Sequence, residues 1–319
     1  MPPATNAVNG STASPLPASP TLGAGTPYKF KVLDCFSGIG GFSLGLECTG
    51  GFETVAFCEI EDFPRKVLAK HWPDVPCYRD VRELTAERLA ADGIAVDVIT
   101  GGFPCQDLSI AGLKAGMAEG TRSGLWSEII RLVREIRPSF LIVENVANLL
   151  RGPTERPGRW FGRVLGDLAE CGYDAEWENI PARDVGLQHH RERVWVVAYP
   201  DEIGRRGFGQ GPQFLDVLRR RPRGTPPPPL SGRADVERRL HALVADSVRT
   251  GLPGGSCGDA HGVSDRLDRL AALGNAVVPQ IPELIGHAIL QSLHNTGSQF
   301  TESNGPAVSQ GFHSPNIPA

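Results

Sequence analysis

The chain has 319 residues, of which 40% are hydrophobic and 21% are charged, and its formal net charge is −4. This length suits one large α/β domain or such a domain with a small insert, and no run of ~18 apolar residues occurs that would span a membrane. The seven cysteines include no Cys-x-x-Cys pair, which argues against a disulfide framework and against a zinc site.

Residues 1–27 are rich in Pro, Ser, Thr and Ala, and they lack the charged and apolar blocks of a signal peptide. We expect this segment to be a disordered tail, because it has too little apolar surface to fold. The missing signal peptide leads us to expect a cytoplasmic protein.

From residue 28 to residue 198, short apolar runs alternate with amphipathic stretches. The apolar runs predict buried strands over Lys29–Cys35, Thr54–Cys58, Val96–Thr100, Phe140–Val143 and Val194–Ala198. The amphipathic stretches predict helices over Phe63–His71, Leu84–Asp92, Leu125–Ile136 and Phe161–Cys171. Strands that alternate with helices form βαβ units, so the predicted fold class is α/β with a Rossmann-like, doubly wound, mostly parallel sheet.

The alternation stops after Ala198. Residues 199–263 contain a Pro226–Pro229 run and many glycines, and only Ala234–Ala245 reads as a helix. Between residues 199 and 262 there are ten Arg against seven Asp or Glu. Arginine is well suited to guanine edges and phosphates, yet a genomic bias towards arginine codons explains this composition equally well.

Helical patterns return over Arg266–Leu273 and Pro282–Leu293, and the polar segment 296–319 is predicted to be a second disordered tail. We therefore expect a catalytic domain over residues 28–198 that is completed by residues 264–295. The segment 199–263 would be an insert in this domain.

A glycine loop, Asp34-Cys-Phe-Ser-Gly38-Ile-Gly40-Gly41, follows the first predicted strand. Glycines at a strand-to-helix turn let the backbone approach a ligand at the helix N-terminus. Glu59 ends the second strand, where doubly wound folds place a carboxylate on ribose hydroxyls, and Asp80 is placed to reach an adenine amine. A tight turn and a solvated surface acid would give the same pattern.

The third predicted strand runs into Gly101-Gly-Phe-Pro104-Cys105. The Cys105 sulfur would lie beyond the carboxyl end of a central strand, where open α/β sheets bind ligands and where neighbouring amides can favour a nucleophilic thiolate. Glu144 ends the next strand, so one β-α-β crossover would bring the thiol and the carboxyl to one ligand. A buried, unreactive cysteine and a helix-capping glutamate are the alternatives.

Six motifs resemble those of the cytosine-C5 DNA methyltransferase family, of bacterial or phage type. In chain order they are DCFSGIGGFSLGLE, FCEIEDF, GGFPCQDLS, ENV, RERVWVVA and ALGNAVVPQ. The combination of FPCQ, ENV and the late GNAVVPQ motif is specific to that family.

The resemblance implies a role for each matching residue. Phe36, Gly38 and Gly40 would surround the methionine part of S-adenosylmethionine, with Glu59 on the ribose and Asp80 near the adenine. In the catalytic motifs, Pro104 would orient the loop of the nucleophile Cys105, and Glu144 would hold cytosine N3. The remaining matches are Arg191 and Arg193, which would border the flipped base, and Asn275, which would fold back beside the first motif.

The resemblance also implies the reaction and the partners. The thiolate of Cys105 would add to cytosine C6, and the activated C5 would take the methyl group. A base such as water would then remove the C5 proton, and the thiolate of Cys105 would be expelled. No metal is implied. The substrate would be double-stranded DNA read by the insert, the protein a monomer, and a cognate restriction endonuclease a partner that acts on the same site.

Three other functions compete with DNA methylation. An RNA cytosine methyltransferase would use the same site, and the arginine-rich insert does not exclude RNA. A methyltransferase-like binding protein would need no nucleophile, so the set Cys105, Glu144 and Arg191 argues against it. A thiol oxidoreductase is disfavoured because no resolving cysteine lies near Cys105 in the sequence.

Overall fold

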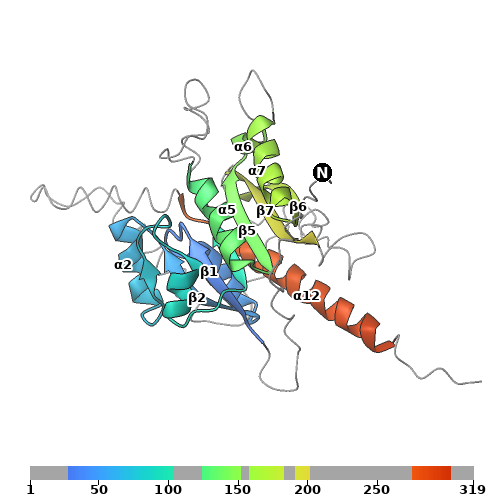
Figure 1. Ribbon diagram of the computed structural model, residues 1–319, viewed down its shortest axis with the longest axis horizontal. Coiled ribbons are helices and arrows are strands. Elements are labelled where there is room, and N and C mark those ends of the chain that lie inside the picture. The colour runs from blue at the N-terminus through green and yellow to red at the C-terminus, as the bar shows by residue number, and fades with distance from the viewer. Residues whose placement is uncertain (1–27, 104–123, 152–157, 183–190, 202–274, 303–319) are drawn as a thin grey trace, which may run out of the picture.

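The computed structural model describes residues 28–103, 124–151, 158–182, 191–201 and 275–302 (Figure 1). The predicted tail 1–27, residues 303–319 and most of the predicted insert lie outside these ranges, as do Pro104 and Cys105. Residues 296–302 were predicted to belong to a disordered tail, and this was wrong, because they continue the helix that begins at Gln280. Within the described ranges, no helix is both long and apolar enough to cross a membrane.

Seven strands form one sheet in the order β3-β2-β1-β4-β5-β7-β6. Their bounds are β1 Phe30–Cys35, β2 Phe52–Cys58, β3 Cys77–Tyr78, β4 Val98–Gly101, β5 Phe140–Val146, β6 Tyr173–Pro181 and β7 Glu192–Pro200. The pairs from β3 to β5 are parallel, whereas β7 runs antiparallel to both β5 and β6. The prediction of a mostly parallel α/β sheet is confirmed.

Helices cover both faces of this sheet (Figure 1). Their bounds are α1 Gly41–Cys48, α2 Asp62–His71, α3 Ala86–Ala91, α5 Gly124–Ile136, α6 Asn148–Arg151, α7 Arg159–Glu170 and α12 Gln280–Glu302. One core joins strand residues such as Leu33 and Ile99 to α5 and α7, and the other joins Val32 and Val98 to α1 and α12. Adjacent strand residues therefore face opposite cores, as expected of a parallel sheet that is buried on both sides.

The five predicted strands and the four predicted helices of the region 28–198 all have counterparts in the structure. The sequence did not predict β3, β6, α1 or the four-residue helix α6. Strand β6 is an edge strand whose polar and apolar residues are mixed, and its Trp177 is 41% exposed, so it has no continuous apolar run. Helix α1 contains Gly41 and Gly45, and glycine disfavours helix interiors.

The strand order reverses between β1 and β4, which are parallel neighbours with Cys35 paired to Gly101. The chain segments that follow these two strands therefore emerge side by side at the same edge of the sheet. A crevice at such a switch point is where doubly wound sheets bind their ligands. The glycine loop follows β1, and the segment leading to Cys105 follows β4.

Candidate functional site

The glycine loop after β1 holds a backbone conformation that favours glycine. The φ angles are +52° at Phe36, +53° at Gly38 and +86° at Gly40. The backbone N–H of Gly38 donates to Glu59 Oε2 at 2.7 Å, and the N–H of Glu61 donates to Glu59 Oε1 at 2.8 Å. These two bonds fix the carboxylate of Glu59, which is 7% exposed, against the glycine loop.

The carboxyl group of Asp34 lies beneath this loop and is fully buried. Thr100 Oγ1 donates to its Oδ1 at 2.7 Å, and Ser43 Oγ donates to its Oδ2 at 2.9 Å. Burial raises the pKa of Asp34 to about 7, although both hydrogen bonds oppose the shift. Asp34 therefore ties the end of β1 to α1 and to β4, a role that the sequence did not reveal.

Asp80 lies on the turn that follows β3. Its Oδ1 accepts from the backbone N–H of Arg82 at 3.0 Å and from Arg82 Nε at 2.9 Å. The hydrogen bond from the Arg82 side chain is the main cause that lowers the pKa of Asp80.

A buried ion-pair cluster surrounds Glu144 on β5. Arg193 Nε lies 2.8 Å from Glu144 Oε1, and Arg191 Nη2 lies 3.8 Å from the same oxygen. Burial raises the pKa of Glu144, and the two guanidinium groups oppose this shift. A carboxyl group under these two opposing influences is suited to exchange a proton or a hydrogen bond with a ligand.

The cluster forms because β7 runs antiparallel to β5. Glu144 pairs with Trp195, and Val146 pairs with Arg193, so the glutamate and the arginine occupy neighbouring positions on one face of the sheet. A pocket borders this face, and it is lined by Glu144, Ile180, Ala182, Arg191, Arg193, Trp195, Val278 and Ile281.

The late motif lies against both parts of the site. Arg191 Nη2 donates to the carbonyl oxygen of Asn275 at 3.2 Å. A Cβ added at Gly41 would lie 2.5 Å from the carbonyl oxygen of Val277, and one added at Gly45 would lie 2.1 Å from that of Pro279. The first glycine-rich motif and the late motif thus pack backbone to backbone.

The end of β4 approaches the Glu144 cluster. A Cβ added at Gly102 would lie 3.5 Å from Glu144 Oε2, and Asn145 Nδ2 donates to the carbonyl oxygen of Phe103 at 3.0 Å. Asn145 is buried, and its Oδ1 accepts from the N–H of Val146 at 2.8 Å. Asn145 is a site residue that was not predicted from the sequence, and its side chain anchors Phe103, the last described residue before Pro104.

The structure places the predicted site residues in two adjoining groups. The first contains Glu144, Arg191, Arg193 and Asn275, and the second contains Phe36, Gly38, Gly40 and Glu59. Asp80 lies on the neighbouring turn after β3, whereas Pro104 and Cys105 lie outside the described residues. The strand β4, which leads to Pro104 and Cys105, pairs with both β1 and β5.

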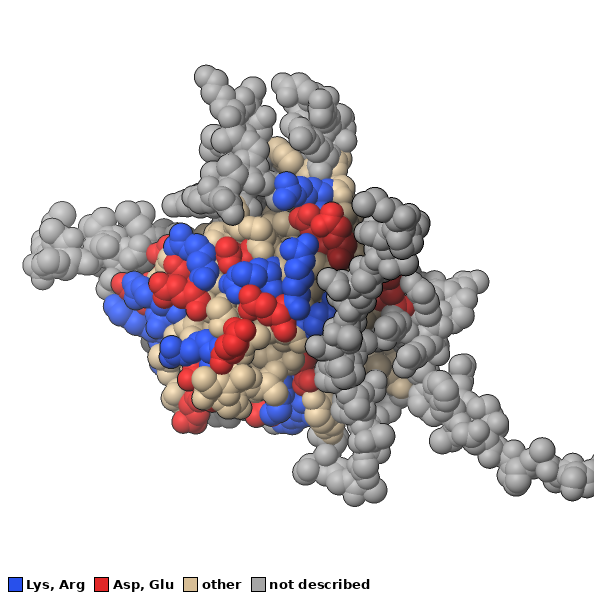
Figure 2. All heavy atoms as spheres, viewed as in Figure 1, with Lys and Arg blue, Asp and Glu red and all other residues tan. Residues whose placement is uncertain are grey.

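The other charged residues are distributed differently. On the face shown in Figure 2, Lys and Arg side chains lie among Asp and Glu side chains. Exposed ion pairs among the described residues include Arg79–Asp62 and Arg88–Asp92. A surface that binds a nucleic acid backbone is expected to carry an excess of positive charge. The described residues on the face in Figure 2 do not carry such an excess of positive charge.

Comparison with known proteins gives a consistent result. A family model described as C-5 cytosine-specific DNA methylase matches residues 30–212. The type II methyltransferase M.Sau3AI of Staphylococcus aureus is 35% identical over 55% of this chain and 44% of its own length. The type II methyltransferase M1.ScrFI of Lactococcus lactis subsp. cremoris is 36% identical over 54% of this chain and 42% of its own length.

This chain therefore spans less than half the length of these two relatives. Among solved structures, the Dnmt2 methyltransferase of S. pombe aligns with a TM-score of 0.50 at 15% identity, covering 82% of this chain and 99% of its own. At that identity the structural similarity establishes a shared fold alone.

Proposed function

The chain belongs to the C-5 cytosine-specific DNA methylase family, and from this premise we propose that it methylates C5 of cytosine in double-stranded DNA with S-adenosylmethionine as the methyl donor. The enzyme would be a DNA (cytosine-5-)-methyltransferase. The observation that carries the proposal is the buried carboxyl group of Glu144, which two arginines hold beside the strand that leads to Cys105.

The glycine loop and its neighbours fit the proposed cofactor. Glu59 accepts one backbone N–H on each carboxylate oxygen, and each oxygen can accept a second hydrogen bond, for example from a ribose hydroxyl. Phe36, Gly38 and Gly40 would surround the methionine part of S-adenosylmethionine. Asp80 would accept from the adenine amine.

The chemistry of the proposed reaction is divided between Cys105 and Glu144. The thiolate of Cys105 forms a bond to C6 of the flipped cytosine, and the displaced electron pair is stabilised by a hydrogen bond or proton from Glu144 to N3. S-adenosylmethionine would supply the electrophilic methyl group that the activated C5 takes, and S-adenosylhomocysteine would be the leaving group. A base such as water then takes the C5 proton, N3 returns any proton to Glu144, and the thiolate of Cys105 is expelled as the ring is restored.

The two arginines support Glu144 and border the base pocket. Arg193 holds Glu144 Oε1 directly, and Arg191 connects the same cluster to the backbone of Asn275. A cytosine must leave the duplex before it can enter this pocket, which costs roughly a few kcal/mol. Contacts of the arginines with the flipped base would offset part of that cost.

The names of the relatives support a role in restriction and modification, since both are type II methyltransferases. We place the enzyme in the cytoplasm as a monomer, together with a cognate restriction endonuclease that acts on the same DNA site. Residues 199–263 would recognise that site, and no metal would take part. Pro104 would orient the loop that carries Cys105.

The test is base-resolution mapping of 5-methylcytosine in a host that lacks cytosine methylation. Wild-type protein should methylate one short sequence context, and Cys105→Ser should abolish this methylation. Glu144→Gln should reduce it by roughly 10²- to 10⁴-fold, the usual contribution of a general acid. Glu170→Gln is the matched control, because the side chain of Glu170 is 72% exposed and pairs with Arg134 at 3.6 Å.

Unchanged methylation by Cys105→Ser would refute the covalent mechanism. A well-folded wild-type protein that leaves DNA unmodified would refute the DNA substrate, and RNA from the same cells would then be mapped.

A further inference from the structure

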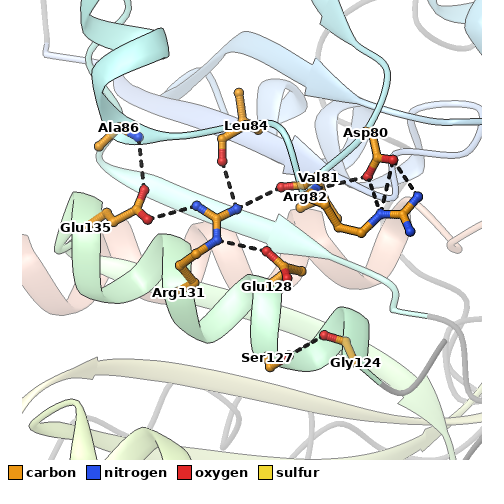
Figure 3. A network of polar contacts seen from close by, with 10 residues as sticks. All are labelled: Asp80, Val81, Arg82, Leu84, Ala86, Gly124, Ser127, Glu128, Arg131 and Glu135. Carbon is orange, nitrogen blue, oxygen red and sulfur yellow. Dashed lines mark hydrogen bonds and ion pairs between the residues drawn. The ribbon is translucent and has the colours of Figure 1, made fainter. Parts of the chain in front are cut away.

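The side chain of Arg131 on α5 reaches across to the turn that carries Asp80 (Figure 3). Arg131 Nη2 donates to the carbonyl oxygens of Val81 and Leu84 at 2.9 and 2.8 Å. Val81 is 4% exposed and Leu84 is 1% exposed, so this part of the turn is packed into the core. Loss of the guanidinium would leave two carbonyl groups without these partners at a partly buried position.

Two glutamates on the same helix hold the guanidinium in place. Arg131 Nε lies 2.8 Å from Glu128 Oε2, and Arg131 Nη1 lies 2.8 Å from Glu135 Oε1. Glu135 Oε2 also accepts from the backbone N–H of Ala86, the first residue of α3, at 3.1 Å. The planar, fork-like guanidinium therefore links α5 to the turn and to the helix that follows it.

Asp80 is rigidly connected to this anchored turn. The backbone N–H of Glu83 donates to the carbonyl oxygen of Asp80 at 3.1 Å, and the N–H of Arg82 donates to its carboxylate at 3.0 Å. Both the backbone and the side chain of Asp80 are thus bound within the segment that Arg131 holds. A shift of this segment would displace the carboxylate as well.

We propose that Arg131 is a positioning residue that sets the selectivity of the cofactor site for adenine, by holding the Asp80 carboxylate where it meets the exocyclic amine. This inference rests on the proposed function, because it requires an adenosyl cofactor. Arg131 acts through the turn and does not touch the ligand. Its loss should therefore weaken the recognition of the adenine amine and leave the binding of the rest of the cofactor intact.

Calorimetric titration with two ligands tests this proposal. S-adenosylhomocysteine carries the amine, and S-inosylhomocysteine has a carbonyl oxygen in its place. Wild-type protein should prefer the adenosyl ligand, and Arg131→Met should bind it about tenfold more weakly, which corresponds to about 1.4 kcal/mol. The affinity of Arg131→Met for the inosyl ligand should stay within about twofold of the wild-type value.

Two further variants distinguish positioning from general support of the fold. Arg131→Lys keeps the positive charge but lacks the planar guanidinium with its several donors. Its preference for the adenosyl ligand should therefore lie between those of the wild type and of Arg131→Met. Asp80→Ala should lose the preference for the adenosyl ligand. The double variant with Arg131→Met should bind S-adenosylhomocysteine no more weakly than Asp80→Ala does, because both substitutions act on the contact with the adenine amine. Arg134→Met, on the same helix with its exposed pair to Glu170, is the matched control and should bind both ligands as the wild type does.

An equal loss of affinity for both ligands in Arg131→Met and Arg131→Lys would overturn the proposal, as would wild-type affinity for both. A further loss in the Asp80→Ala background would also overturn it. Failure of the wild-type protein to bind either ligand would refute the cofactor itself and this inference with it. Adenosyl selectivity that depends on Arg131 would support the inference even if the DNA were left unmethylated.

Discussion

The carboxyl group of Asp34 lies at a position where a negative charge is costly because it is removed from water. It is fully buried, and three elements meet around it because Ser43 on α1 and Thr100 on β4 both donate to it. Two neutral hydroxyl donors offset only part of the cost of burying the charge, so its pKa rises from 3.8 to about 7. Near neutral pH this residue is thus poised between its neutral and its charged form.

The raised pKa of Asp34 has a defined consequence for stability. The folded protein holds this proton more tightly than the unfolded chain does. The resulting contribution to the free energy of unfolding is fully present below about pH 4 and is lost as the pH rises through about 7. Asp34→Asn removes the titration, so the stability of wild type relative to the variant should fall by a few kcal/mol between these two limits.

Urea unfolding of both proteins at several pH values between 4 and 8 measures this difference. Asp74→Asn changes an exposed aspartate and serves as the control, with a difference from wild type that should not depend on pH in this way. A constant difference between wild type and Asp34→Asn would contradict the prediction.

Individual site residues differ in how far the sequence reveals them. Glu144, Arg191 and Arg193 stand in motifs whose order along the chain is informative. Asp34 also stands in a motif, but its significance depends on Thr100, which lies 66 positions away. Asn145 and Arg131 were missed for the same reason, since their partners Phe103 and Val81 are brought to them only by the fold.

At the scale of elements, the contact between α1 and the start of α12 is unusually close. Gly45 lies in α1, and a Cβ there would lie 2.1 Å from the carbonyl oxygen of Pro279 and 3.1 Å from the backbone nitrogen of Glu283. Both neighbours are backbone atoms, which cannot turn aside as a flexible side chain could. Any side chain at position 45 must therefore push α12 away from the glycine-rich motif.

Gly45→Ala should lower the free energy of unfolding by about 1–3 kcal/mol, the usual cost of overpacking. Gly166→Ala is the matched control, because Gly166 also lies within a helix, α7, but has nothing within 4 Å of the added Cβ. This control should stabilise the protein by up to about 1 kcal/mol, since alanine favours a helix more than glycine. Denaturant unfolding of the two variants measures the change in the free energy of unfolding relative to wild type. Equal changes in Gly45→Ala and Gly166→Ala would argue against close packing at Gly45.

Elements were predictable where burial on both faces leaves a continuous apolar run, as in β1, β4 and β5. The same reasoning could not reveal β6, an edge strand, or the two-residue strand β3. Helix α1 was not predicted because two of its residues are glycines, which disfavour a helix but allow close packing against Val277 and Pro279. The antiparallel direction of β7 was likewise not determined by its apolar sequence, which is compatible with either direction.

At the scale of the whole molecule, the chain leaves the described body after β7 and rejoins it at Asn275, beside Arg191. The chain leaves at the end of β7 that pairs with the start of β5, whereas Asn275 lies beside Arg191 at the other end of β7, so the segment begins and ends at opposite edges of the sheet. Our proposal is that residues 199–263 form an insert with its own task of reading DNA. The catalytic fold would then not depend on the insert.

Replacing residues 202–263 with a Gly/Ser linker of about 20 residues tests whether DNA reading is separate from cofactor binding. S-adenosylhomocysteine affinity should stay within about twofold of the wild-type value, because the residues around Glu59 are untouched. Sequence-specific DNA methylation should fall by more than about 100-fold, because phosphate and base contacts would be lost. If ligand binding disappeared as well, the segment would belong to the catalytic fold itself.

The packing of α12 on α1 also has a consequence for synthesis on the ribosome. About 230 residues separate the end of α1 from the start of α12. At a translation rate of about 5–20 residues per second, roughly 10–50 s pass between the synthesis of α1 and that of α12. A nascent or prematurely terminated chain therefore lacks the support for its glycine loop, and the methylation that we propose would begin only after nearly the whole described chain has been translated.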